Sequence, residues 1–121
     1  MKILPPDEKF SQLSTKQLVD NIKDVSNIVR ARIISVLGSR LNESTLVFES
    51  IKDSIMEPAN INSRVMGLTT VSWFGIITLL ENGNDFQKKV ITEIMRDWDK
   101  QDRDDLVHYL RDFPQYTSYI N

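Results

Sequence analysis

The sequence has no cysteine, and this absence excludes a disulfide framework, thiolate metal sites and a cysteine nucleophile. It has a single histidine, which leaves too few imidazoles for a typical zinc site. Phosphate-binding loops, dinucleotide-binding glycine patterns and HExxH motifs are also missing. We therefore expect a non-enzymatic protein that carries no cofactor and no metal.

Glycine and proline are scarce, with four of each among 121 residues, and they fall mostly between periodic apolar segments. This pattern predicts one all-α domain, residues 1–121, with short connections. The longest uncharged run, residues 65–80, is short for a membrane span and contains glycine, serine and threonine. It predicts a buried helix. Because residues 1–10 lack the apolar core of a signal peptide, we expect a cytoplasmic protein with no membrane contact.

The charge balance also limits the possible partners. The formal net charge is -2 and the isoelectric point is near 5.3. This is the wrong sign for a general nucleic-acid binder, and the sequence has no long run of lysine or arginine. We expect no nucleic-acid partner, and a protein partner is favoured instead.

Apolar spacing predicts about six helices that form three helix–turn–helix pairs. Capping boxes are expected at Ser14 with Gln17 and at Asn84 with Gln87, and Gly38 is expected just past a helix end. Residues 1–13 are expected to be a lead-in and residues 114–121 a tail that is docked or frayed. The first expected helix begins after Ser14, and the second follows a break at residues 24–27 and ends before Gly38. The others run from a cap at Asn42 to Pro58, over 63–81, from Asn84 to Trp98 and over 102–113.

The second helices of the three pairs share a sequence pattern. Arg30, Arg64 and Arg103 each stand near the expected start of such a helix. Apolar residues follow each arginine at four and at seven positions further along. Self-similarity of this kind is typical of helical repeats.

The first pair, residues 15–38, carries Asp24 before the turn, Val29-Arg30 after it and Leu37-Gly38 at the end. With these residues it resembles a HEAT repeat of the bacterial short type. The resemblance implies a short right-handed HEAT-like array of three stacked antiparallel hairpins. A non-repetitive helical bundle is the alternative. The resemblance also implies that Arg30 pairs with turn carboxylates, for which Asp24 and Asp53 are the candidates, although backbone carbonyls could serve as well.

In HEAT-like arrays the second helices line the concave surface, so the resemblance implies a partner-binding face there. Trp73 has the central place on this face, as an interface hot spot would. Burial of Trp73 in the core is the alternative. A module of this kind could be an adaptor, an inhibitor or an immunity-type protein. The candidate partner-binding residues are Arg32, Met66, Thr69, Trp73, Asp105, His108 and Asp112.

Two other interpretations stay open. Gly67 and Gly75 would allow close approach to the 63–81 helix, so a small-ligand or cofactor-handling protein with a pocket beside that helix is possible. Asp104, His108 and Asp112 lie at i, i+4 and i+8, a spacing that could hold a metal or transfer a proton. A solvated helix face explains these three residues better.

Overall fold

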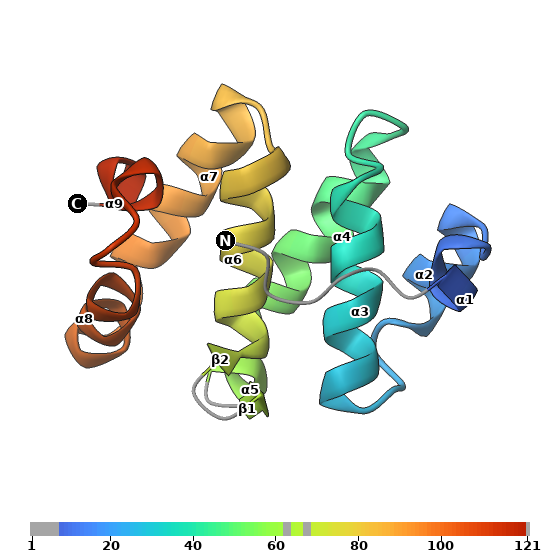
Figure 1. Cartoon of the computed structure of the whole chain (residues 1–121), viewed down its shortest axis with the longest axis horizontal. Coiled ribbons are helices and arrows are strands. Elements are labelled where there is room, and N and C mark those ends of the chain that lie inside the picture. Colours follow the sequence, from blue (N-terminus) through green and yellow to red (C-terminus); the bar gives the residue numbers. More distant parts are fainter. Residues whose placement is uncertain (1–7, 62–63, 67–68, 121) are drawn as a thin grey trace.

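The computed structural model describes residues 8–61, 64–66 and 69–120, and it shows a mostly helical fold (Figure 1). The all-α prediction is confirmed, with one short two-stranded ladder added. The elements are α1 (Glu8–Ser11), α2 (Thr15–Asn21), α3 (Asn27–Gly38), α4 (Thr45–Met56), α5 (Pro58–Ile61), β1 (Arg64–Met66), β2 (Thr69–Thr70), α6 (Val71–Asn82), α7 (Asp85–Arg96), α8 (Lys100–Tyr109) and α9 (Pro114–Ile120).

Helix α6 lies at the centre of the molecule. Figure 1 shows α3 and α4 on one side of it and α7, α8 and α9 on the other, with α1 and α2 packed outside α3. Residues 71–80 of α6 are all buried, as expected of a helix that is apolar on every face. Within the described part of the chain, no helix has the length and apolar character required to span a membrane.

The predicted helix 63–81 is wrong over its first turns. β1 and β2 pair in antiparallel fashion there, and α6 begins only at Val71. The hydroxyl of Thr70 caps the helix by accepting a hydrogen bond from the backbone N–H of Trp73, at 3.1 Å. Arg64 therefore lies on a strand, where it is not equivalent to the early helical residues Arg30 and Arg103.

Local hydrogen bonds set several helix starts. Both predicted capping boxes, at Ser14 and at Asn84, are confirmed with reciprocal side-chain and backbone bonds. The predicted cap at Asn42 is wrong, because α4 begins at Thr45 and its N-cap residue is Ser44. Asn42 instead lies in the turn that precedes the helix.

Two glycines let neighbouring helices approach α6. Gly38 is the last residue of α3 rather than a residue beyond its end, and a Cβ there would clash with Cγ2 of Thr78. A Cβ at Gly75 would lie 2.7 Å from Cγ1 of Ile55 on α4. Gly75 thus faces a packed helix and not a ligand pocket, whereas Gly67 lies outside the described residues.

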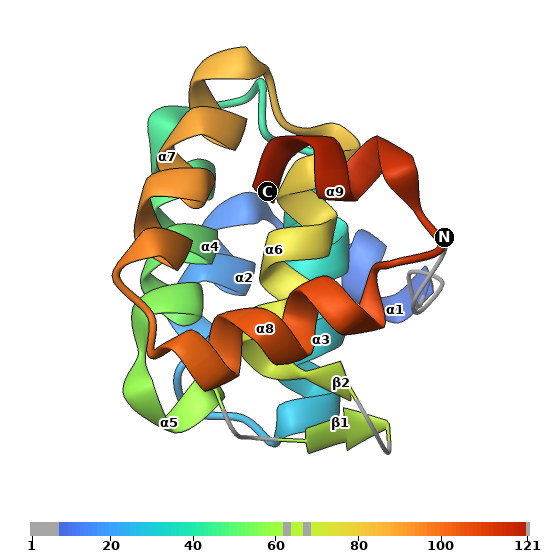
Figure 2. The same cartoon turned by 90° about the vertical axis from the view of Figure 1, so that its left-hand side faces the viewer.

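The C-terminal segment forms a docked helix. Residues 114–120 form α9, and Tyr116 is buried against the body of the protein. Its hydroxyl donates a 2.8 Å hydrogen bond to Oε1 of Glu81, and Thr92 Oγ1 donates one of 2.8 Å to the carbonyl of Tyr119. Figure 2 shows α9 lying across the face of the molecule that α8 also covers. Pro114 therefore begins a helix, and the last predicted helix ends earlier than expected, at Tyr109.

Candidate functional site

Two of the predicted partner-binding residues are buried. Thr69 is 4% exposed and Trp73 is 7% exposed. The indole ring of Trp73 packs against the ring of Tyr109 on α8, and Oγ1 of Thr69 shares a 3.1 Å hydrogen bond with the Tyr109 hydroxyl. The hypothesis that Trp73 is an exposed anchor is corrected, since α8 covers it and both residues belong to the core.

The other predicted partner-binding residues do not share a continuous surface with Thr69 and Trp73. Asp105, His108 and Asp112 are exposed. On α8, Leu106 is buried and Asp105 and His108 face water, whereas Asp112 lies in the turn after the helix. Arg32 is half-buried on α3, on the other side of α6. Met66 lies on β1, and its side chain is outside the part that the structure describes.

The face of α8 has the properties of a solvated helix surface. The ammonium of Lys100 lies 2.6 Å from Oδ2 of Asp104, and this hydrogen bond lowers the pKa of the Asp104 carboxyl. Among the described residues, no three side chains of the metal-ligating types are grouped closely enough to hold an ion.

Arg30 binds carbonyl groups of the turn between α2 and α3. Its Nε donates to the carbonyl of Ile22 at 2.8 Å, and its Nη2 donates to those of Lys23 and Val25 at 3.0 Å each. Its Nη1 contacts the side-chain oxygens of Asn27 and Asn60. The carboxylates expected from the family resemblance are not among these acceptors. Carbonyls at a helix end lack intrahelical partners, so they are ready acceptors.

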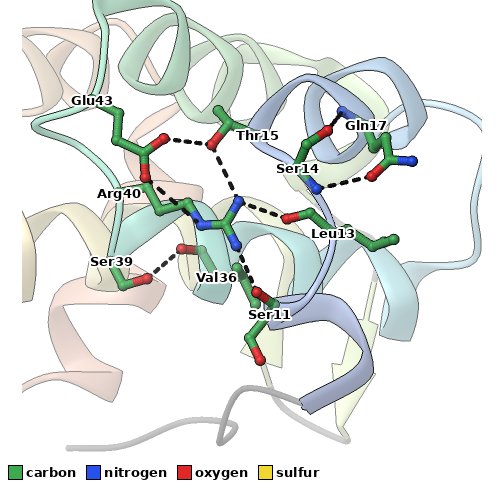
Figure 3. A network of polar contacts seen from close by, with 9 residues as sticks. All are labelled: Ser11, Leu13, Ser14, Thr15, Gln17, Val36, Ser39, Arg40 and Glu43. Carbon is green, nitrogen blue, oxygen red and sulfur yellow. Dashed lines mark hydrogen bonds and ion pairs between the residues drawn. The ribbon is translucent and has the colours of Figure 1, made fainter.

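Arg40 holds the other end of α2 in the same way (Figure 3). Its Nη2 donates to the carbonyl of Ser11 at 2.8 Å, and its Nη1 donates to the carbonyl of Leu13 at 2.9 Å. Thr15 and Glu43 complete the network through a 2.7 Å hydrogen bond. Arg30 and Arg40 therefore tie both ends of α2 to α3. The hydrogen bonds of both arginines stabilise the fold.

A groove of about 400 Å³ lies where α4 and α7 begin. Leu41 and Phe48 form its apolar floor and are nearly buried, at 8% and 6% exposed. Phe86, on the first turn of α7, is 68% exposed beside them. Phe86, Val90 and Ile94 recur at i+4 steps, and this spacing predicts a buried stripe that Ile91 and Met95 widen. In the structure the fully buried residues of α7 are Ile91 and Met95, and Phe86 is exposed. We call this feature the Phe86 groove.

Polar side chains surround this apolar floor. Within the part of the chain that the structure describes, the side chains of Asn42, Ser44 and Thr45 form no hydrogen bond with the protein. The carboxylate of Glu49 is paired with the Lys52 ammonium at 2.7 Å. The Phe86 groove is thus close to uncharged, with an apolar base and available hydrogen-bonding groups at the rim.

No protein-family model, curated protein sequence or solved structure matches this chain. The resemblance of residues 15–38 to a HEAT repeat stays a prediction. The functional assignment below is based on the geometry of the described residues.

Proposed function

We propose that this chain is a non-enzymatic helical module that binds another protein, and that the partner docks in the Phe86 groove. The observation that carries the proposal is the exposure of Phe86, a large aromatic side chain that projects beside an apolar hollow. Exposed apolar surface of this kind is typical of interaction sites, and aromatic anchors dominate the binding energy of many interfaces.

The chemistry of the groove defines the partner segment. Phe48, Leu41 and Phe86 favour an apolar side chain of the partner. Asn42, Ser44 and Thr45 can form hydrogen bonds with backbone amides or with uncharged polar side chains. The matching segment is apolar and uncharged where it enters the groove, since Glu49, the charged residue among the described residues that line it, is paired with Lys52.

The sequence-derived proposal of a HEAT-like stack of hairpins is compatible with this assignment. An adaptor, an inhibitor and an immunity-type protein would all use such a surface. The proposed binding site is not the face predicted from the sequence, which had Trp73 at its centre, because α8 covers Thr69 and Trp73.

The test places the photo-crosslinking amino acid p-benzoylphenylalanine at position 86, with matched proteins carrying it at position 108 on the exposed face of α8. We expect a discrete crosslinked partner from position 86 and none from position 108. Crosslinks from position 108 alone would move the binding surface to the face of Asp105 and Asp112. The absence of crosslinks at both positions would contradict the proposed function.

Binding of the identified partner is then measured by calorimetry. The substitution Phe86→Ser is expected to weaken the Kd by about 30-fold, the effect of losing a hot spot of roughly 2 kcal/mol. Leu46→Ser is the matched control, because Leu46 is 53% exposed on α4 but does not line the groove. Equal losses for the two variants would show that the groove has no special role.

A further inference from the structure

A second hollow lies at the opposite end of α4 from the Phe86 groove. Its volume is about 300 Å³, and it opens between the α2–α3 turn, the last turns of α4 and helix α5. Volumes in this range suit small molecules. The residues that matter here are Lys23, Arg30, Asp53, Ser54, Glu57 and Asn60.

The walls of this pocket carry opposite charges. Lys23 and Arg30 come from the α2–α3 side. Asp53 comes from the last turn of α4, and Glu57 is the C-cap residue that follows this helix. In the described part of the chain, neither carboxylate forms an ion pair with either cation. The pocket therefore has a positive wall and a negative wall that do not neutralise each other by contact.

The floor of the pocket is polar and fixed. Asn60 is 5% exposed, and its Nδ2 donates a 2.8 Å hydrogen bond to the carbonyl of Ser54. The nitrogens of Arg30 are engaged by carbonyl and amide oxygens, so Arg30 contributes its charge while Lys23 retains free donors. A floor held by such bonds is preorganised for a polar ligand.

We propose that this pocket binds a small zwitterion that carries one ammonium and one carboxylate. The ammonium lies against Asp53 and Glu57, and the carboxylate lies toward Lys23 and the charge of Arg30. A ligand of one charge would be attracted by one wall and repelled by the other. Only a molecule with both charges matches the two walls together. This site is separate from the Phe86 groove, and its test is independent of the proposed function.

The experiment titrates the isotope-labelled protein with glycine, β-alanine, 4-aminobutyrate and 5-aminopentanoate, and follows the backbone amide signals by NMR. These probes increase the separation of the two charges step by step. We expect one of them to shift the signals of Lys23, Asp53 and Glu57 in a saturable manner. Butyrate and butylamine, each with one charge, are expected to bind at least tenfold more weakly.

Two variants that each remove one charge test the roles of the walls. Asp53→Asn and Lys23→Gln are each expected to weaken binding of the best probe at least tenfold, and both residues are exposed, so the fold is retained. Glu49→Gln, in the Phe86 groove, is the control and should bind normally. The proposal is overturned if no probe shifts these signals, or if butyrate or butylamine binds as tightly as the zwitterion. A loss of stability in Asp53→Asn without any probe binding would assign the carboxylates to balancing the charge of Arg30 only.

Discussion

The indole ring of Trp73 packs against the phenol ring of Tyr109, with ring centroids 5.2 Å apart and planes inclined at 38°. Trp73 belongs to the first turn of the central helix α6, and Tyr109 is the last residue of α8. Aromatic pairs in this geometry stabilise beyond their buried area. The pair therefore fixes α8 against α6, and it places Trp73, the residue predicted at the centre of the binding face, in the core.

The first prediction concerns this aromatic pair. Trp73→Ala is expected to lower the free energy of unfolding by about 3–5 kcal/mol, as loss of a large buried aromatic does. Tyr109→Phe keeps the ring but removes the hydrogen bond with Thr69, so it should cost about 1 kcal/mol. Urea denaturation followed by far-ultraviolet circular dichroism measures both. Unchanged stability of Trp73→Ala would contradict the packing described.

The second prediction concerns the guanidinium of Arg30. Arg30→Met leaves the carbonyls of Ile22, Lys23 and Val25 without their donor, and we expect a loss of about 2 kcal/mol in unfolding free energy. The control is Lys16→Met, because the Lys16 side chain is 86% exposed and its ion pair with Asp20 is long, at 3.8 Å. Equal effects in the two denaturation curves would show that the carbonyl contacts do not stabilise the fold.

The third prediction concerns the contact of α3 with α6. Gly38→Ala places a methyl group against Cγ2 of Thr78, and we expect a loss of about 1–3 kcal/mol from overpacking despite the better helix propensity of alanine. Thr78→Ser removes that Cγ2 and keeps the hydroxyl. The double variant should therefore lose less unfolding free energy than the sum of the losses of the two single variants. A double-mutant cycle measures this difference. Strict additivity would refute the steric explanation.

The fourth prediction concerns the pH dependence of stability. Burial, followed by the hydrogen bond to Glu81, raises the pKa of Tyr116 from 10.0 to about 12. The folded state therefore holds this proton more tightly than the unfolded state, so the stabilisation is complete below pH 10 and is lost as the pH rises toward 12. Two pKa units at about 1.4 kcal/mol each correspond to a complete loss of about 3 kcal/mol, of which roughly 2 kcal/mol falls between pH 10 and pH 12.

Tyr116→Phe cannot ionise, and it provides the reference for this measurement. The difference in unfolding free energy between the natural protein and this variant should shrink between pH 10 and pH 12, while other tyrosines and lysines affect both proteins alike. A difference that stays constant over this range would show that Tyr116 titrates normally.

Features that depend on neighbouring residues could be predicted from the sequence. The capping boxes at Ser14 and Asn84 each join residues three positions apart, so their hydrogen bonds do not depend on distant parts of the fold. The central place of residues 71–80 also followed from composition, because a helix that is apolar on every face must be covered on every face.

Features that depend on distant residues were not predictable. Apolar spacing placed Phe86 and Ile91 on the same stripe of α7, and only the position of the neighbouring helices leaves Phe86 at the surface and Ile91 in the core. Likewise, spacing continues smoothly through residues 64–70, so the change from strand to helix at Val71 is not visible in it.

The sequence by itself determined an all-α chain with an apolar central segment, two local helix caps and no cysteine chemistry. Tertiary structure decided that Trp73 is core, that Phe86 is exposed and that Arg30 binds carbonyls. The physical reason is that periodicity specifies which residues share a face of an element. Which face is covered, and by what, depends on packing between elements far apart in the chain.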